Sequence, residues 1–509
     1  MIGIGGDIGM RSKRQEAQKE MKPRMMATTA ILATIMAANG VRAFQMPNLA
    51  SVVSFQPIIN SLAAPEGASK WKLRLSATDA SELDSHSHDT ENKIVLEQKT
   101  WMFQNKYPIA YEVASNVVDN DANNDDDVEV VPILLLNGFG VGSFHQHRLM
   151  RQLLLENNES QLQQQYLIYG IDYLGQGKSW PENCDDGKSN DELNLGYSAD
   201  LWLDQLKGFI EEVIVPSSTS KKVHLAGNSV GGYLSTILTN RHPHLISSLT
   251  LMNATPVWGL NLPGWDGKLP APPLPKMVGR ALFDTIRNED VIDKYLETAY
   301  VHREAFDGTF GDSFNECGTN NNALGAKIQA CTESKGGHAA FASILWSAPA
   351  SERKEGEICE SPPTPADFYG ALKSLPVDVL LLFGSDDPWC TPAVAKRMHT
   401  TLFSRDDVAV DAPPVQRYIS LENVGHCPNH EAPTAVAKVL LPWIKASSAL
   451  LSPTNIDDAD QSRSKVPLVS SSGSAEIREP WGDIIAREVS IEESQDLGMI
   501  DRIVSSMVG

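Results

Sequence analysis

Between residues 94 and 448 the chain alternates short apolar runs with longer amphipathic stretches, and this alternation restricts the fold more than any other feature. Strand, crossover helix and strand in repeated succession build a parallel sheet covered by helices on both faces. Nearly unbroken apolar runs are typical of strands that are buried on both sides. The pattern therefore predicts an α/β fold with a mostly parallel, doubly wound sheet. The expected strands are residues 130–136, 167–171, 222–226, 248–252, 377–383 and 416–421.

Two longer segments complete this organisation. Residues 200–214 (DLWLDQLKGFIEEVI) place apolar side chains on one stripe at the helical period, which predicts a crossover helix. The fourth and fifth expected strands are about 120 residues apart, far more than an ordinary connection needs. We therefore divide the α/β core into residues 94–253 and 371–448, with a cap or lid inserted at residues 254–370.

Both ends of the chain differ from this core. Residues 25–38 form an apolar stretch behind several cations, so residues 1–43 are interpreted as a signal peptide. Residues 44–93 are interpreted as a transit-like, disordered leader, because the part directly behind Phe44 is poor in acids. The pair resembles the bipartite leaders of proteins sent to complex plastids, and secretion or a wrong start codon is the alternative. Residues 449–509 are rich in Ser and Asp and are expected to be a disordered tail, with a short helix near residues 481–489.

Composition excludes several classes of function. With 64 acids and 43 bases the net charge is −21, which would repel nucleic-acid phosphates. The 6 cysteines show no zinc spacing and are too few for a disulfide scaffold. The acidic run DNDANNDDD at residues 119–127 lacks the glycine and glutamate spacing of a calcium loop, so it is interpreted as a solvated insertion. We expect no metal and no diffusible cofactor.

The first chemical motif follows the third expected strand. Gly227-Asn228-Ser229-Val230-Gly231 has the pattern G-x-S-x-G and is followed by a helical stretch. A nucleophile on a sharp turn between strand and helix leaves no room for side chains at the two flanking glycines. The motif predicts Ser229 as a nucleophile, with Gly227 and Gly231 forming its elbow. A chance Gly-rich turn is the alternative.

A serine hydroxyl needs a base, and the base needs a carboxylate that fixes its tautomer. The strand at residues 377–383 is followed by Asp386 and Asp387, and the last strand is followed by His426 in a Gly-His-Cys-Pro loop. Functional groups of doubly wound sheets gather at these carboxyl ends of the strands. Both aspartates are candidates, and we prefer Asp387 because it precedes Pro388. The expected triad is Ser229, Asp387 and His426.

Acyl transfer also needs two donors for the oxyanion. The amide of Val230, directly after the nucleophile, is one candidate. The glycine-rich loop NGFGVG at residues 137–142 provides the other, and we assign it to the amide of Phe139. This loop could also be read as a dinucleotide turn, but its third glycine and the downstream acid are out of register.

These residues give the chain a clear resemblance to the serine-dependent α/β-hydrolases, and within them to the pheophytinase-like plastid esterases. The blocks NGFGVGSFHQH, GIDYLGQGKS, AGNSVGGY, LMNATPVWG, GSDDPW and GHCPNHE follow the order of that family. The resemblance covers roughly residues 95 to 446. It implies hydrolysis of the phytyl ester of pheophytin or chlorophyll by the triad named above, in a plastid. Val230 stands where related chlorophyllases carry Arg, which favours the pheophytinase side.

The inserted cap is expected to hold the oily substrate. It is rich in aromatic residues, and an isoprenoid alcohol and a flat macrocycle both suit an aromatic pocket. We name Trp258, Phe341 and Trp346 as candidate substrate contacts. The substrate itself suggests peripheral contact with a thylakoid membrane. The alternatives are a lipase-like or carbon–carbon bond hydrolase of the same fold, or a noncatalytic carrier of pigment or isoprenoid.

Overall fold

The structure is a computed structural model. It describes residues 94–116, 129–159, 165–184, 194–310, 323–352, 364–405, 413–448, 466–470 and 472–496. The predicted leader, the acidic run at residues 119–127 and part of the predicted tail lie outside these residues. No helix within the described ranges is both long and apolar enough to cross a bilayer.

The described residues are organised around one sheet of 10 strands in the order β1-β2-β4-β3-β5-β6-β7-β8-β10-β9. The strands from β4 to β8 in this order all pair in parallel. The prediction of a mostly parallel α/β sheet is therefore confirmed. The strands are β1 (Ile94–Phe103), β2 (Tyr107–Asn116), β3 (Val130–Leu136), β4 (Gln165–Ile171), β5 (Val223–Asn228), β6 (Ile246–Met252), β7 (Asp378–Gly384), β8 (Gln416–Glu422), β9 (Ser474–Glu479) and β10 (Gly482–Glu488).

All six expected strands exist, with ends that differ by at most two residues. The strands that we did not predict are β1 and β2 at one side of the sheet and β9 and β10 at the other. These pair in antiparallel fashion and mix charged with apolar residues. The helix expected at residues 200–214 is α6 (Ala199–Phe209), which continues into a single π-helical turn at Ile210–Ile214.

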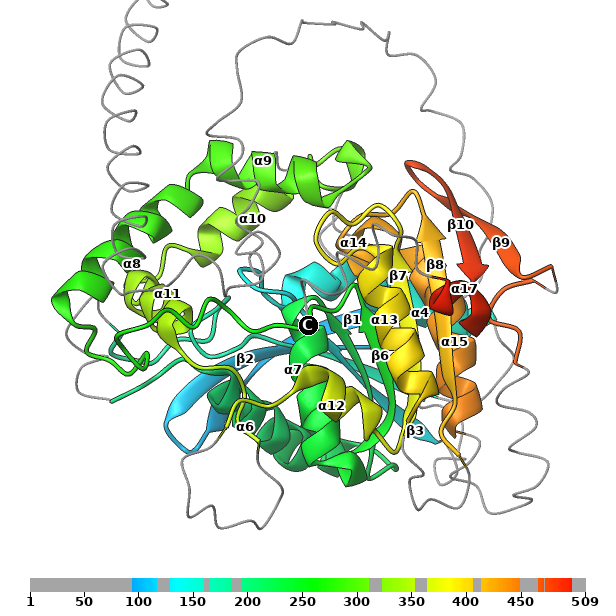
Figure 1. Ribbon diagram of the computed structural model, residues 1–509, viewed down its shortest axis with the longest axis horizontal. Coiled ribbons are helices and arrows are strands. Elements are labelled where there is room, and N and C mark those ends of the chain that lie inside the picture. Colours follow the sequence, from blue (N-terminus) through cyan, green and yellow to red (C-terminus); the bar gives the residue numbers. More distant parts are fainter. Residues whose placement is uncertain are drawn as a thin grey trace, which may run out of the picture.

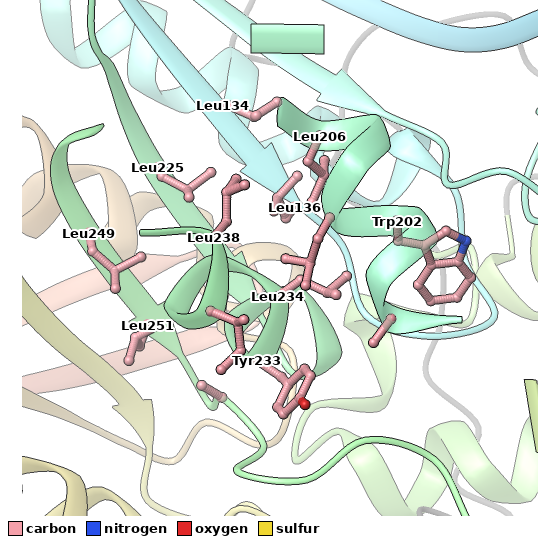
Figure 2. Close-up of a cluster of buried hydrophobic side chains, with 14 of the residues drawn as sticks. Leu134, Leu136, Trp202, Leu206, Leu225, Tyr233, Leu234, Leu238, Leu249 and Leu251 are labelled. Carbon is pink, nitrogen blue, oxygen red and sulfur yellow. The ribbon is translucent and has the colours of Figure 1, made fainter. Parts of the chain in front are cut away.

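Helices cover both faces of the sheet (Figure 1). On one face, α4 (His147–Glu159) packs against α15 (Pro433–Ser448). On the other face lie α6, α7 (Val230–Arg241), α12 (Phe368–Lys373) and α13 (Pro392–Phe403). Figure 2 shows how leucines of β3, β5 and β6 meet α6 and α7 in this second core. Burial of each side chain of this size contributes about 1.5–3 kcal/mol to the stability of the fold. The packed sheet therefore holds the ends of its strands in fixed positions.

Between β6 and β7 the chain leaves the sheet and forms a separate group of helices. They are α8 (Pro273–Ile286), α9 (Glu289–Ala299), α10 (Leu324–Cys331) and α11 (Gly337–Trp346). In Figure 1 these helices, drawn in green, lie together beside the carboxyl end of the sheet strands. Below we call residues 254–352 the cap.

The prediction for the C-terminal region is wrong for residues 474–495. These residues form the hairpin β9–β10 and the short helix α17 (Ile491–Gln495), and the expected helix near residues 481–489 is a strand. The hairpin extends the sheet, because β10 pairs with β8. The burial of its residues alternates, so Ile477 and Ile484 are its only large apolar side chains in the core. Two such residues are too weak a sequence signal to predict two strands at the edge of a sheet. Residues 449–465, 471 and 497–509 of the predicted tail lie outside the described part of the chain.

Candidate active site

Ser229 lies in a tight turn between β5 and α7. Its backbone has φ 55° and ψ −119°, a combination that side-chain-bearing residues rarely adopt. A β-carbon on Gly227 would collide with the backbone of Gly231, and one on Gly231 would lie 2.7 Å from the carbonyl oxygen of Leu136. The turn therefore needs glycine at both positions, as the motif predicts. It is held by the amide of Ser229, which donates to the carbonyl of Met252 at 3.1 Å.

Asp387 and His426 meet at the carboxyl ends of β7 and β8. Nδ1 of His426 lies 2.7 Å from Oδ2 of Asp387, and both side chains are buried. Burial alone would raise the pKa of Asp387, but the charge and hydrogen bond of His426, the amide of Trp389 and the side chain of Asn253 together lower it. The ionised form of Asp387 is therefore favoured, and this carboxylate can hold His426 in the tautomer with its proton on Nδ1.

The neighbouring candidate, Asp386, does not face His426. It is exposed, and its Oδ2 accepts from the hydroxyl of Ser385 at 2.7 Å and from the amide of Asn423 at 3.1 Å. The structure thus pairs the histidine with Asp387, the aspartate that precedes proline.

Ser229 and His426 line the same cavity. The side chain of Asn228, next to the serine, donates to the carbonyl of His426 at 2.9 Å, so the two loops are tied together. Among the hydrogen bonds of the described residues, none joins Oγ of Ser229 to the ring of His426. Catalytic hydrogen bonds are often long in unliganded enzymes and tighten when substrate binds.

The loop after β3 lies over the nucleophile. A β-carbon on Gly138 would lie 3.3 Å from Cβ of Ser229, so the backbone approaches the serine closely. The side chain of Asn137 donates to the carbonyls of Gly138 and Val141, and the hydroxyl of Tyr173 donates to the carbonyl of Asn137. These bonds fix the loop on which the expected oxyanion donor, the amide of Phe139, is located.

The second expected donor is the amide of Val230. Val230 is the first residue of α7, where amides have no partner within the helix and the helix dipole is positive. The phenyl ring of Phe139 also lines the cavity. The structure therefore brings both expected oxyanion residues to the nucleophile turn.

The cavity above Ser229 is mainly apolar, and the cap provides most of its wall. Phe341 lines it, with ring centroids 6.3 Å from Phe139 and 5.3 Å from Phe283. The further apolar residues of the cap that line it are Ile286, Val291, Ile292, Tyr295, Leu296, Leu324, Ile328 and Ile344.

The other two expected substrate contacts do not line this cavity, and we correct that prediction. Trp258 is buried against Trp202 and Tyr233 of the core, and its indole donates to Ser347 at 3.2 Å. Trp346 is buried beside Trp265, and its indole donates to the carbonyl of Pro263 at 3.1 Å. Aromatic content indicated an apolar cap correctly, but it does not tell which rings face inward.

A polar network lies at another part of the cavity wall. Nε2 of His145 is 2.9 Å from the hydroxyl of Tyr300, which is 3.2 Å from Nδ1 of His430. Burial raises the pKa of Tyr300 well above its usual value. Burial, with help from nearby Arg148, lowers the pKa of His430 well below its usual value. The phenol and the His430 imidazole therefore stay neutral and exchange hydrogen bonds without a net charge.

The buried carboxylate of Glu431 connects the cap to the loop of His426. Its Oε1 accepts from the amides of Val301 and His302, at 2.8 and 2.7 Å, and its Oε2 accepts from the amide of Gly425 at 2.7 Å. The amide of His426 in turn donates to the carbonyl of Ala299 at 2.7 Å. One side chain thus joins the end of α9 to the residue before the histidine. The Glu431 carboxylate also raises the pKa of His302.

Asp387, Cys390 and His426 form the one cluster of metal-type donors found among the described residues. Two of these groups are already joined by their own hydrogen bond. Burial raises the pKa of the Cys390 thiol well above its usual value, which disfavours the thiolate that a metal would require. The arrangement suits a proton-transfer pair better than a metal centre.

Sequence reasoning missed several residues that organise the site. Asn253 donates to Oδ2 of Asp387 at 2.8 Å, and Asn228 ties the nucleophile turn to His426. Both follow or end a parallel strand, so the carboxyl-end rule that found the triad could have found them too. Glu431 ends the short helix α14 (Pro428–Glu431) and Gln176 lies in a turn, and only the folded cap and turn reveal their partners.

Comparison with known proteins is consistent with this geometry. The sequence model of the alpha/beta hydrolase family matches residues 133–439. A curated relative, the chloroplastic pheophytinase of Arabidopsis thaliana, is 28% identical over 356 residues, which are 63% of this chain and 62% of the relative. The chain therefore spans about 62% of the length of the curated relative that it matches.

Two solved structures are among those to which the chain is similar. An esterase from Thermogutta terrifontis has a TM-score of 0.42 and 16% identity, with 69% of this chain and 99% of that chain covered. A putative lipase from Acinetobacter baumannii has a TM-score of 0.44 and 15% identity, with 70% and 92% covered.

Proposed function

Because the chain belongs to the alpha/beta hydrolase family, we propose that it is a serine esterase that removes the phytyl chain from a chlorophyll-derived pigment. The observation that carries the proposal is the buried Asp387–His426 pair, whose histidine lines the same cavity as the strained Ser229. The relative named as a pheophytinase supports the substrate class, and so does the apolar, aromatic wall that the cap provides.

The proposed reaction has two steps. Oγ of Ser229 attacks the ester carbonyl while Nε2 of His426 takes its proton, and the resulting oxyanion accepts hydrogen bonds from the amides of Val230 and Phe139. The intermediate collapses to an acyl-enzyme, and phytol leaves with the proton of His426. Water then gives a proton to His426 and attacks the acyl group, which releases the pigment acid and restores Ser229.

Each residue has a distinct physical task in this reaction. The low pKa of Asp387 keeps a negative charge beside the imidazolium that forms in both steps. The loop of Phe139 and the start of α7 are held in place before substrate arrives, so their amides need no reorganisation when charge develops. We also propose that the protein acts in a plastid, as the printed name of its relative says of that protein.

The test compares three esters with purified protein: pheophytin, chlorophyll and a short nitrophenyl ester. We expect release of phytol from at least one pigment, and the ratio of the two pigment rates tells whether central magnesium matters. Ser229→Ala should lower kcat on the order of 10⁵-fold or more without changing the thermal unfolding temperature. A fluorophosphonate probe should label Ser229 in the wild type only.

Other outcomes identify the alternative functions. Hydrolysis of the short ester alone would indicate a lipase-like esterase, and pigment binding without labelling of Ser229 would indicate a carrier. Pigment hydrolysis that survives in Ser229→Ala would contradict the proposed mechanism.

A further inference from the structure

Gln176 lines the cavity from the turn that follows β4, and only 6% of its surface is exposed. Its Oε1 accepts a hydrogen bond from the amide of Gly140 at 2.9 Å. Gly140 has φ 80° and directly follows Phe139, so this bond holds the loop that covers Ser229. Because the amide of Gly140 is used in this way, it is not a donor for the oxyanion.

The other end of the same side chain has no partner. Nε2 of Gln176 is buried, and no group of the described residues accepts a hydrogen bond from it. A buried polar group without a partner costs about 1–3 kcal/mol. Two other polar side chains of the cavity are paired, Asn228 with the carbonyls of Met252 and His426, and His145 with Tyr300. Gln176 therefore carries an unused donor at the wall of the cavity.

The turn holds this donor rigidly. The amide of Gln176 donates to Tyr173, and its carbonyl accepts from Ser179, at 2.9 and 3.0 Å. Gly175 and Gly177 on either side have positive φ, and a β-carbon on Gly177 would collide with Asp172. The buried carboxylate of Asp172 fixes the turn further by accepting from the amide of Lys178 at 2.7 Å. A donor held in this way loses little conformational entropy when it binds a ligand.

We propose that Gln176 is a substrate-binding residue whose side-chain amide donates a hydrogen bond to a carbonyl-type oxygen on the acid part of the ester. This inference rests on the proposed esterase function and names a contact within it. Oε1 bonds to the residue after Phe139, and Gln176 lines the same cavity as Phe139 and Ser229, so the acid part of an ester attacked by Ser229 would occupy the space beside Gln176. A pigment acid carries ketone and ester oxygens beyond the scissile bond, whereas the acyl part of a short nitrophenyl ester carries none.

The decisive variant is Gln176→Glu. It keeps an oxygen for the amide of Gly140 but replaces the donor with a second acceptor. We expect KM for the pigment ester to rise roughly 10-fold more than KM for the nitrophenyl ester, as the loss of one buried hydrogen bond predicts. The defect should grow as pH rises, because a protonated carboxyl group still donates and an ionised one does not.

Two further variants separate the roles of the side chain. Gln176→Met removes both the donor and the support of the Gly140 amide, so it should raise the pigment KM and also lower kcat on both esters. It is uncharged, so it also serves if the glutamate variant does not fold. Gln329→Glu adds the same charge on α10 of the cap without lining the cavity and should match the wild type.

Equal changes of KM for the two esters in Gln176→Glu, or no change for either, would overturn the inference. A residue with a purely structural role, or one whose Nε2 donates to water, would give one of these results. Failure of the esterase proposal is distinguishable, because the wild type would then show no Ser229-dependent hydrolysis of any ester.

Discussion

Ser229 is held in a backbone conformation that costs energy, and the surrounding residues show how the protein maintains it. Strained residues of this type typically cost about 1–3 kcal/mol and persist only where neighbouring structure determines them. Here the carbonyl of Ser229 accepts from the amides of Gly232, Tyr233 and Thr255. The fold is therefore less stable than it would be with a relaxed turn, and in return the hydroxyl of Ser229 is held at the N-terminus of α7.

Asp387 and Asp386 allow a sharp test, because adjacent residues of the same type have different surroundings. Asp387→Asn should place an amide donor against Nδ1 of His426, which forces the proton to Nε2 and prevents that atom from acting as a base. We expect kcat to fall by roughly 10⁴-fold, measured with any ester that the wild type hydrolyses.

Asp386→Asn is the matched control and should change kcat by no more than about twofold, as an exposed substitution normally does. Thermal unfolding of both variants shows whether they fold. A larger loss in Asp386→Asn than in Asp387→Asn would reverse the assignment.

At the scale of single residues, the sequence predicted the residues that follow strand ends. It failed for residues whose orientation depends on tertiary contacts. Ser229, Asp387 and His426 each follow a strand that its apolar run reveals, so their proximity could be expected. Trp258 and Trp346 lie in the same aromatic-rich cap as Phe341, yet of these three residues only Phe341 lines the cavity. Composition does not tell which aromatic side chains of the cap point into the cavity.

At the scale of elements, Glu431 joins the cap to the loop that carries His426. Glu431→Gln keeps one acceptor and turns the other into a donor that faces a backbone amide. We expect a fall of roughly 10-fold in kcat with little change in KM, because small displacements of a catalytic group lower the rate more than binding. Steady-state kinetics with the pigment ester measure both constants.

The control for this variant is Glu297→Gln, on α9 of the cap. Glu297 pairs with Arg303 at the exposed surface, where such pairs contribute about 0–1 kcal/mol. It should leave kcat unchanged. A loss confined to thermal stability in Glu431→Gln, with kcat preserved, would show that Glu431 has no positioning role.

The hairpin β9–β10 brings another buried carboxylate to the start of α15. Glu479 accepts from the amide of Ala435 and the hydroxyl of Thr434, both at 2.9 Å, and burial raises its pKa to about 7. Since the folded pKa is higher than the unfolded value of 4.5, its contribution to stability is complete below that value and is lost as pH rises through about 7.

Glu479→Gln should flatten this pH dependence. We expect the free energy of unfolding of the wild type to fall relative to that of the variant, by on the order of 1–3 kcal/mol, between pH 5 and about pH 8. Denaturant unfolding at several pH values measures this difference. Glu476→Gln, on the exposed face of β9, is the control and should follow the wild type. Parallel curves for the wild type and Glu479→Gln would refute the prediction.

At the scale of the whole molecule, the parallel centre of the sheet was predictable and its antiparallel borders were not. A strand buried on both faces needs an apolar run, as in β7 (DVLLLFG), whereas β9 (SAEIRE) needs only one inward apolar residue and a partner. That partner, β10, itself depends on the edge of β8. A sequence pattern shows only which residues of a local segment are buried. The border strands could not be predicted in this way, because they are held by pairing with residues far away in the sequence.

The position of β10 against β8 has a consequence for biosynthesis. A ribosome releases β8 and the loop of His426 well before residues 482–488 emerge, so the nascent sheet first exists with β8 as its border. A bare border strand invites pairing with other chains. Synthesis therefore passes through an interval in which Ser229, Asp387 and His426 can already assemble while the edge of β8 is still unpaired, and the later arrival of β10 covers that edge.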